Sequence, residues 1–296
     1  MKWIHNLNCV IKGFYKLTSV IIEFKQWKNG TLRAPHKPIL FLYALGQWQQ
    51  GNKVLSWEQT QPILTKLLNQ FGTPSRKQTP ENPWGRLYKD NLWQLNPHAF
   101  EINGNFSAKV FKETQSTGQL SKEIQEYLSD RPEELLHWVR EILDDQFPPS
   151  QHDDIQLACG ISTFGELLPN KRKRDPRFSF EILRNYGNRC AICGYSLQID
   201  QQIIGLEAAH IQWHAFSGPD TVDNGIALCS IHHKLFDYGA FALSDDYTII
   251  VSRRINGLSI NEIAKFHGSS ILEHPVDFVY PNLKFVRWQR AQVLKS

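Results

Sequence analysis

The chain has 296 residues, of which 41% are hydrophobic and 21% charged, and its formal net charge is +4. This length and composition exclude a disordered chain and favour two globular domains. The longest apolar run, 39–45, is too short to cross a membrane, and the N-terminus lacks the features of a signal peptide, so we expect a cytoplasmic protein with no membrane partner.

The charge is divided unevenly along the chain. Residues 1–113 hold 15 Lys and Arg against 6 Asp and Glu, a net +9, together with six tryptophans. Residues 114–170 hold 3 against 11, a net −8, and residues 171–296 hold 15 against 12, a net +3. A basic, tryptophan-rich segment is typical of a phosphate-binding surface with stacking aromatic rings, but a basic surface over an aromatic core explains it equally well.

The basic part is predicted to contain buried helices. A dense apolar segment, 19–24, precedes a helix that begins near Lys37, with proline close to its first turn. A second helix is predicted over 59–71, where apolar residues recur at helical spacing. Between 73 and 97, four prolines and the alternating run 91–95 predict loops around a small hairpin or strand pair.

The acidic part is predicted to be helical over 123–128 and 132–147, with Pro148-Pro149 as a stop. Because its charge would repel DNA, we expect these helices to form a structural layer behind the basic face. The basic run 171–174 is typical of a solvated linker, and 177–186 is predicted to be a helix that opens a second domain.

Together these patterns predict an α+β protein. Its N-terminal domain, 1–158, is mainly helical with a small β element, a linker covers 159–175, and the second domain is 176–296. The five cysteines are an odd number in a chain without a signal peptide, which argues against a disulfide framework. Cys9 and Cys159 are predicted to be reduced core thiols.

Two pairs of metal-binding residues share one spacing. Cys190-Ala191-Ile192-Cys193 is followed by Cys229-Ser230-Ile231-His232, with 35 residues between the two pairs. Three cysteines and one histidine form a closed tetrahedral zinc site, with no coordination position left for a substrate. We therefore predict structural Zn²⁺ at Cys190, Cys193, Cys229 and His232. A thioredoxin-like redox pair would leave Cys229 and His232 unexplained.

Further histidines lie between and after these pairs in a defined order. His210 lies in a predicted strand, 207–211, Asn224 lies in an Asp-Asn-Gly turn, and His233 opens a predicted helix. From about Arg189 to Leu243 the chain resembles the HNH nuclease family, whose ββα-metal motif has these residue types in this order. The resemblance implies that His210 is the general base, Asn224 orients it, and His233 binds a catalytic Mg²⁺ or Mn²⁺.

The chemistry supports these roles, with some alternatives open. A neutral histidine can take a proton from water, and a divalent ion stabilises charge on the phosphate oxygens. His233 and Asp237 are four residues apart and share a helix face, which predicts Asp237 as a second ligand. Where the HNH family often has a metal ligand before the base, this chain has Ala209. Glu207, on the same strand face, either replaces it or is a surface carboxylate; His214 either contacts phosphate or caps a turn.

The two halves together resemble the phosphorothioated-DNA-binding restriction endonucleases, in which a sulfur-binding domain precedes an HNH domain. The resemblance is carried by Arg33-Ala34-Pro35-His36-Lys37-Pro38, by Asn82-Pro83-Trp84-Gly85-Arg86-Leu87, and by Phe147-Pro148-Pro149-Ser150. It implies binding of double-stranded DNA in which sulfur replaces a non-bridging phosphate oxygen. An apolar pocket can prefer sulfur because sulfur is less well hydrated than oxygen, while nearby cations hold the charge.

By this resemblance the expected DNA contacts are His36, Lys37, Pro83 and Arg86. Pro83 would form a pocket wall, although Asn82 stands where the family often has an aromatic residue. Arg86 is explained equally well by a base or phosphate contact and by a structural salt bridge, and His36 by a helix cap.

The sequence therefore predicts a type IV-like restriction endonuclease that binds phosphorothioated DNA and hydrolyses nearby phosphodiesters. One alternative is an HNH endonuclease that depends on methylated or hydroxymethylated bases. Another is a non-catalytic, zinc-containing DNA reader, in which Ala209 marks a degenerate site. With one nuclease site per chain, cutting both strands requires two separate events or a homodimer.

Overall fold

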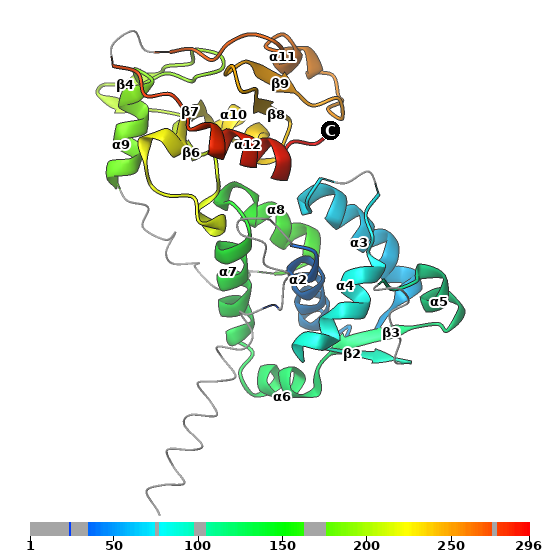
Figure 1. The fold of residues 1–296 in the computed structure, drawn as a ribbon. Coiled ribbons are helices and arrows are strands. Elements are labelled where there is room, and N and C mark those ends of the chain that lie inside the picture. The colour runs from blue at the N-terminus through cyan, green and yellow to red at the C-terminus, as the bar shows by residue number, and fades with distance from the viewer. Residues whose placement is uncertain (1–23, 25–34, 75–76, 98–104, 163–175, 274–276) are drawn as a thin grey trace, which may run out of the picture.

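The computed structural model describes Phe24 and residues 35–74, 77–97, 105–162, 176–273 and 277–296 (Figure 1). The predictions for Cys9, for most of the apolar segment 19–24 and for the linker residues 163–175 lie outside these ranges. None of the helices in the described ranges combines the length and apolar character needed to cross a membrane.

The N-terminal part is mainly helical, with three short strands. Its first elements are α2 (His36–Gln49), β1 (Leu55–Ser56), α3 (Trp57–Phe71), α4 (Glu81–Arg86), the 3₁₀ helix η1 (Leu87–Asp90) and β2 (Trp93–Asn96). It continues with α5 (Ala108–Glu113), β3 (Thr117–Leu120), α6 (Lys122–Asp130), α7 (Glu134–Gln146) and α8 (Pro149–Cys159).

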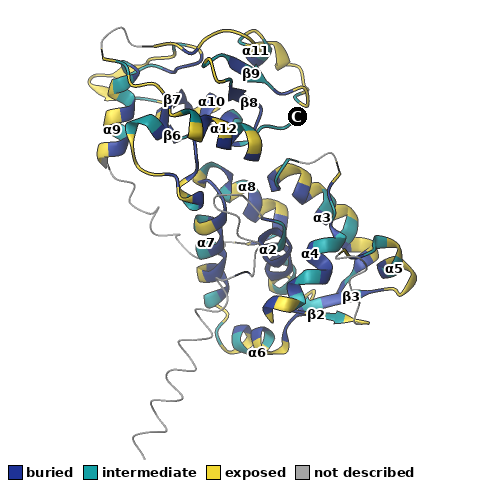
Figure 2. Cartoon of the chain, in the orientation of Figure 1, coloured by how far each residue is buried: buried dark blue, intermediate teal, exposed yellow. Residues whose placement is uncertain are grey.

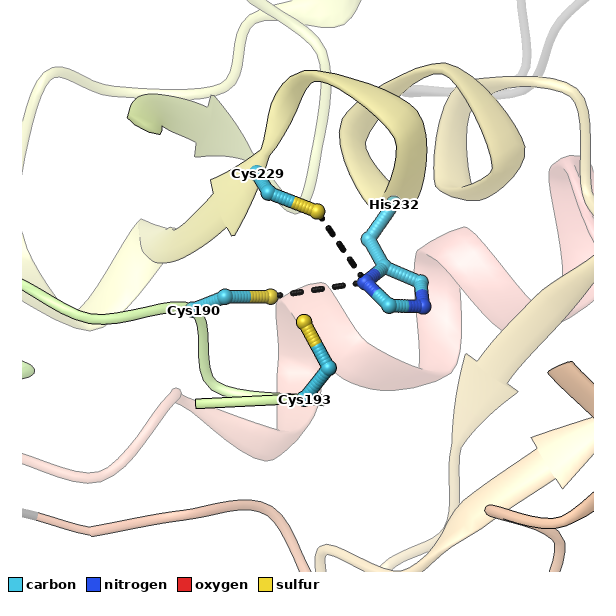
Figure 3. A group of neighbouring side chains, drawn as sticks. All are labelled: Cys190, Cys193, Cys229 and His232. Atoms are coloured by element: carbon cyan, nitrogen blue, oxygen red, sulfur yellow. Dashed lines mark hydrogen bonds between the residues drawn. The ribbon is translucent and has the colours of Figure 1, made fainter. Parts of the chain in front are cut away.

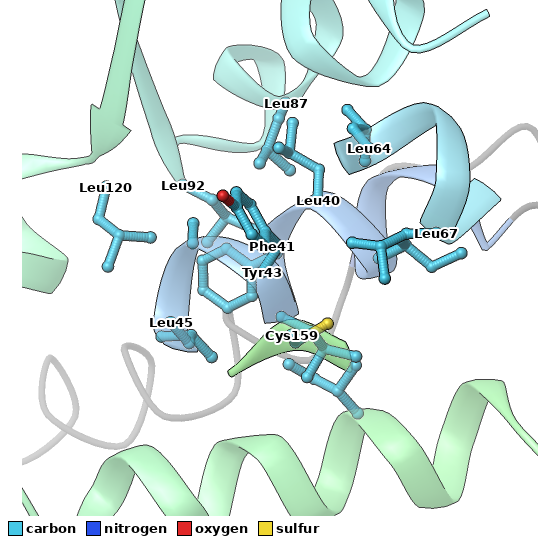
Figure 4. Packing of buried hydrophobic residues seen from close by; sticks show 14 of the residues in the cluster. Leu40, Phe41, Tyr43, Leu45, Leu64, Leu67, Leu87, Leu92, Leu120 and Cys159 are labelled. Carbon is cyan, nitrogen blue, oxygen red and sulfur yellow. The ribbon is translucent and has the colours of Figure 1, made fainter. Parts of the chain in front are cut away.

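Helix α2 is the centre of the N-terminal core. Its residues 38–46 are all buried, so the helix has no solvent face over that stretch (Figure 2). Helices α3, α4, α7 and α8 pack around it, and the side chains in Figure 4 fill the space between them. Cys159, a free thiol at the end of α8, is buried in this cluster as predicted, and burial raises its pKa to about 12.

The small sheet differs from the predicted local hairpin. Strand β2 lies where the alternating run predicts a strand, but it pairs antiparallel with β3, and β1 pairs with the other edge of β3. The run Thr117–Leu120 is short and polar and therefore has no periodic signal. At Gly118 a Cβ atom would lie 2.1 Å from the Trp93 ring, so only glycine lets the two strands approach.

Three tryptophans of the basic segment form core rather than a stacking surface. Trp57, Trp84 and Trp93 are buried, with ring centroids 5.4 Å apart for Trp57 and Trp84 and 5.2 Å for Trp84 and Trp93. For these three tryptophans, the prediction of an aromatic core under a basic surface is correct. Trp3 and Trp27 lie outside the described residues.

The predicted helices are found close to their expected positions, with two additions. Helix α4 lies in the segment predicted to be loops, and α8 begins at Pro149, where the double proline predicted a stop. Proline is well suited to the first turn of a helix because the amide hydrogen it lacks has no partner there. The prediction that Pro148-Pro149 stops the helix 132–147 is therefore confirmed, because α7 ends at Gln146, whereas the start of α8 at Pro149 was not predicted.

The second part of the chain has its own core. Its elements are α9 (Pro176–Asn185), β4 (Gln198–Ile199), β5 (Gln202–Ile203), β6 (Leu206–His210), η2 (His214–Phe216), η3 (Val222–Asn224) and β7 (Gly225–Cys229). They are followed by α10 (Ser230–Asp237), β8 (Phe241–Leu243), β9 (Ile249–Val251), α11 (Ile260–Ala264) and α12 (Leu283–Gln292). The first core cluster ends at Ile161 and the second begins at Phe178, so Cys159 and Ile161 of the predicted linker 159–175 belong to the N-terminal core.

The antiparallel hairpin of β6 and β7 lies between two helices. Alternation along β6 directs Glu207 and His210 to opposite faces. Glu207 meets α10, where its carboxylate contacts His233 at 2.5 Å, whereas the ring of His210 stacks on Phe178 of α9. At Gly225, opposite His210 in the register, a Cβ atom would lie 2.1 Å from Ile182 of α9. The hairpin thus presents one face to each helix.

Helix α8 of the acidic layer joins the two parts of the chain. Asp154 accepts a hydrogen bond of 2.5 Å from the Tyr238 hydroxyl and pairs with Lys234 Nζ at 2.8 Å. Lys295 reaches back to the carbonyl oxygens of Asn69 and Gly72 at 3.2 and 3.1 Å. The acidic helices α7 and α8 pack on α2, and α8 also packs on α10 of the second part (Figure 1).

We expect this joint to weaken in acid. Hydrogen bonds from Lys234 and Tyr238 hold the pKa of Asp154 below its usual value. A carboxylate with a lowered pKa stabilises the folded state at neutral pH and loses that contribution as the pH falls through the lowered value. Asp154→Asn should therefore reduce the melting temperature near neutral pH, and the difference from wild type should vanish in acid.

The exposed neighbour Asp153 offers a matched control for this measurement. Asp153→Asn removes the same charge from the same helix and should leave the melting temperature near its wild-type value. Equal losses from both substitutions would mean that charge on α8, and not the contact with α10, determines the effect.

Candidate functional site

The Cys and His pairs come together at one point. The ligand atoms of Cys190, Cys193, Cys229 and His232 all lie within 4.8 Å of one another. His232 Nδ1 is 3.5 Å from Cys190 Sγ and 3.2 Å from Cys229 Sγ, and the four side chains converge from a turn, a strand end and a helix (Figure 3). Gly194, with φ +73°, allows the tight turn after Cys193.

This cluster fits a metal ion. Burial raises the pKa of the Cys190 and Cys229 thiols and lowers that of His232, so all three side chains tend to stay uncharged. Neutral thiols at this distance stabilise one another only weakly. A metal cation would bind them as thiolates and offset the cost of burying them. The number, type and spacing of the ligands are those of a structural zinc site.

His233 follows the candidate metal ligand His232 on α10 and lies between two carboxylates. Its Nδ1 is 2.5 Å from Glu207 Oε2, and its Nε2 is 3.3 Å from Asp237 Oδ2. Burial works against the charged form of His233, but the two carboxylates outweigh burial and raise its pKa to about 9. A negative field that attracts a proton so strongly also favours a divalent cation.

Asp237 lies on the same helix face as His233, as the spacing predicts, but its oxygens contact protein donors. Trp213 Nε1 donates to Oδ1 at 3.0 Å, and the hydroxyl of Ser150 on α8 donates to Oδ2. The side chain of Asp237 is 3% exposed, whereas that of Glu207 is 45% exposed. Glu207 is therefore better placed to accept an ion beside His233, and a metal-binding role for Asp237 stays a prediction.

His210, the predicted base, ends β6 on the other face of the hairpin. Its Nε2 lies 2.7 Å from Asp220 Oδ1, and its ring stacks on Phe178 at 4.1 Å with an interplanar angle of 11°. The ring of His214, in η2, is 6.1 Å away, which places this histidine near the predicted base. Residues of α9, of η2 and of the loop after it therefore meet at His210.

Asn224 has a different role from the one predicted. Its amide oxygen accepts from the backbone amide of Gln212 at 2.9 Å, and its amide nitrogen donates to the carbonyl oxygens of Gln212 and Pro219 at 3.1 and 2.9 Å. The prediction that this oxygen holds the His210 ring was wrong, because the buried amide satisfies the backbone of the loop 211–224 instead. Asn224 thus acts on the conformation of the loop.

The loop 211–224 joins the two faces of the hairpin. It begins directly after His210, and its Trp213 reaches Asp237, which in turn lies beside His233. The structure therefore connects the predicted base and the predicted metal ligand through one loop and does not place them side by side on the strand.

The four predicted DNA contacts lie on two helices that pack together. Helix α4, which carries Pro83 and Arg86, packs on α2, which begins at His36. His36 Nε2 lies 3.3 Å from Gln78 Oε1; Pro83 is buried, and Arg86 is half-buried. The structure thus brings these residues into one region, as a shared binding site requires, while their contacts with DNA stay a prediction.

Lys37 also forms an ion pair within the protein. Its Nζ donates to both carboxylate oxygens of Asp90, at 3.0 and 2.8 Å. The Asp90 side chain is fully buried and that of Lys37 is 13% exposed. Lys37 therefore stabilises the buried Asp90, which ties α2 to the end of η1.

Sequence reasoning missed Asp90, Asp220 and Phe178. Asp220 lies in a Gly-Pro-Asp turn ten residues after His210, a pattern that predicts a loop but not its contact. Phe178 belongs to a helix whose apolar spacing predicts only core packing. These three roles depend on tertiary contacts that leave no local signal.

Two family profiles match the chain. Residues 15–163 match the ScoMcrA-like DNA sulfur-binding domain, and residues 190–244 match an HNH endonuclease family. None of the curated proteins compared with the chain matches it.

Several solved structures are similar to this chain. The sulfur-binding domain of ScoMcrA complexed with phosphorothioated DNA is 16% identical, with a TM-score of 0.42 over 49% of this chain and 97% of that one. The corresponding domain of SprMcrA, also complexed with phosphorothioated DNA, is 20% identical, with a TM-score of 0.43 over 50% and 93%. The modification-dependent TagI restriction endonuclease is 21% identical, with a TM-score of 0.30 over 46% and 41%.

Removing the metal should unfold the second part of the chain and spare the first. Metal binding supplies much of the folding free energy of small Cys and His sites, and the two parts have separate cores. We expect a strong chelator, or Cys229→Ser, to abolish one of two calorimetric transitions. Cys159→Ala is the matched control and should retain the metal, measured by elemental analysis. Loss of both transitions would contradict independent cores.

Breaking the pair of Lys37 and Asp90 should destabilise the N-terminal part. Lys37→Met leaves the buried carboxylate without this partner, at a cost of about 3–5 kcal/mol in the free energy of unfolding. The double variant Lys37→Met, Asp90→Leu should regain most of that loss, measured by denaturant unfolding, because it buries no charge. A stable Lys37→Met protein would refute the structural role. Weak DNA binding by the restored double variant would support the predicted phosphate contact of Lys37.

Proposed function

We propose that this chain, which belongs to the family of ScoMcrA-like DNA sulfur-binding domains, is a restriction endonuclease that binds phosphorothioated DNA and cuts it nearby. It combines a DNA sulfur-binding domain with an HNH endonuclease domain and is a DNA-hydrolysing enzyme. The observation that carries the proposal is the presence of both domains in one chain, because one explains selection of the DNA and the other its hydrolysis. As an enzyme acting on DNA it is expected in the cytoplasm.

The proposed binding region is the start of α2 together with α4. Pro83 would supply an apolar wall for the poorly hydrated sulfur, while His36, Lys37 and Arg86 would contact the charged phosphate. The close packing of α4 on α2 supports this grouping. Because Lys37 is already paired with Asp90, its contribution to DNA binding would be shared with its structural role.

In the proposed reaction, His210 activates the attacking water. Neutral imidazole takes a proton from water as the water oxygen attacks phosphorus. Phe178 and Asp220 restrain the ring of His210 on two sides, and Asn224 fixes the loop that follows it. This restraint keeps the base in one orientation during proton transfer.

We propose that Zn²⁺ occupies the Cys190, Cys193, Cys229 and His232 site and is structural. Glu207 and His233 would hold a separate divalent ion, Mg²⁺ or Mn²⁺, with Asp237 as a further candidate ligand. Such an ion supplies electrostatic stabilisation of the charge that develops on the phosphate oxygens. The short contact between Glu207 and His233 supports this position, because their oxygen and nitrogen atoms already converge.

Cutting both strands would require more than one event at a single site. A homodimer would place two nuclease domains on one duplex, and a monomer would act twice. Methylated or hydroxymethylated bases are the alternative mark, and a non-catalytic reader is the alternative activity. Each of these hypotheses predicts a different pattern of DNA binding and cleavage.

The test is binding and cleavage of one duplex sequence in four forms: phosphorothioated, methylated, hydroxymethylated and unmodified. We expect tight binding and cleavage only with the phosphorothioated duplex, in Mg²⁺ or Mn²⁺, and none in EDTA. His210→Ala should bind that duplex as wild type does but lose cleavage by a factor on the order of 100 or more. Equal affinity for all four duplexes would refute recognition of sulfur, and binding without cleavage would support the non-catalytic reader.

A further inference from the structure

We propose that Asp220 is the residue that positions His210, a role that the sequence predicts for Asn224. The proposal rests on the proposed function of His210 as the base. It assigns a role to a carboxylate in the loop 211–224. Neither the spacing of the Cys and His pairs nor the order of His210, Asn224 and His233 in the sequence points to this residue.

The contact itself is short and specific. The distance from His210 Nε2 to Asp220 Oδ1 is 2.7 Å, which is typical of a hydrogen bond between an imidazole N–H and a carboxylate. The His210 side chain is 13% exposed and that of Asp220 is 36% exposed. The imidazole is therefore largely enclosed, while its partner borders solvent.

Two further features restrict the His210 ring. Phe178 of α9 covers one ring face, with the planes nearly parallel at 11°. His210 is also the last residue of β6 and pairs with Gly225 of β7, so its backbone is fixed. A stacked ring on a fixed backbone can still make a half-turn about its Cβ–Cγ bond, which exchanges the two edges of the ring, and a hydrogen bond at Nε2 selects one of these two orientations.

Asp220 is held in place by the loop that carries it. Asn224 is fully buried and binds both backbone groups of Gln212 and the carbonyl oxygen of Pro219, the residue before Asp220. At Gly218 a Cβ atom would lie 1.8 Å from the Gln212 carbonyl oxygen, so the loop closes tightly on itself. Asn224 therefore reaches His210 indirectly, because it fixes the loop that presents Asp220.

This geometry determines which nitrogen of His210 acts as the base. When Nε2 carries the proton that Asp220 accepts, the basic lone pair of neutral imidazole is on Nδ1. As the water oxygen forms its bond to phosphorus, the water proton moves to Nδ1, and the bond from phosphorus to the leaving ester oxygen breaks. That oxygen takes a proton from solvent. The carboxylate stabilises the imidazolium that results, as in other histidine and aspartate pairs.

A surface ion pair without a positioning role makes a different prediction. Such a pair would contribute little to stability, and its loss would leave the turnover number unchanged. A positioning residue instead lowers kcat while DNA affinity and melting temperature stay at wild-type values. The same loop contains a matched control, Asp223, whose carboxylate contacts Thr221 and Asn282 and not His210.

The experiment compares Asp220→Asn, Asp220→Glu and Asp223→Asn on the phosphorothioated duplex. We expect Asp220→Asn to lower kcat by about 10- to 100-fold, the usual loss when the partner of a functional histidine is removed. Asp220→Glu should recover part of that loss, and Asp223→Asn should stay within about two-fold of wild type. Equal activity of Asp220→Asn and wild type would overturn the proposal.

A double-mutant cycle separates positioning from other effects. If Asp220 acts through His210, Asp220→Asn should cause no further loss of activity in a His210→Ala background. A loss as large as that in the wild-type background would show that Asp220 acts independently and would refute the proposal.

A spectroscopic measurement tests the contact without relying on cleavage. In protein labelled with ¹⁵N-histidine, the neutral His210 ring should carry its proton on Nε2, and Asp220→Asn should shift it toward a mixture of tautomers. An unchanged ring spectrum would refute the positioning role. If wild type fails to cleave phosphorothioated DNA, the proposed function fails, but a tautomer shift in Asp220→Asn would still uphold the contact between Asp220 and His210.

Discussion

The adjacency of His232 and His233 on α10 is the constraint on which the nuclease domain depends. His232 completes the Cys and His cluster, so the ion proposed there would fix the rotation of the helix about its axis. That rotation determines where the next side chain points, and His233 is directed to Glu207 on β6. The proposed structural metal would thus place a proposed catalytic ligand one residue away, in a small domain whose apolar core alone would hold the helix less firmly.

The same helix is also held from its other end. Its last turn carries Lys234 and Asp237, and both contact α8 of the N-terminal domain. The acidic helices, which would repel DNA, therefore stabilise the joint, where their negative charge meets lysine and tyrosine donors. Such a joint links the DNA-binding domain to the proposed catalytic helix through directional polar contacts, of which the Lys234 pair is partly exposed and the Asp237 side chain is buried.

Much of this arrangement was predictable from the sequence, and the rest was not, for physical reasons. The metal cluster was predictable because two Cys and His pairs at one spacing are typical of zinc sites and of little else, and α2, α3 and α7 follow from helical periodicity. Strand β3 was missed because its four residues are short and polar, and α8 because proline both ends and begins helices. The predicted role of Asn224 differed from its contacts, and that of Lys37 omitted its pair with Asp90. Amide and ammonium groups can bind either protein or ligand, and the sequence does not show which partner a given side chain meets.

The alternation of strand β6 explains why the loop 211–224 is so tightly built. A strand directs residues three apart to opposite faces, so Glu207 and His210 project from opposite faces of β6. The loop that follows the strand reaches both faces. Its Asp220 contacts His210 on the α9 face, and its Trp213 contacts Asp237 on the α10 face. A loop without these contacts would not fix the positions of the proposed base and the proposed metal ligand relative to each other. Closure of the loop by Asn224 and Gly218 is therefore a requirement of placing an HNH site on a two-stranded hairpin.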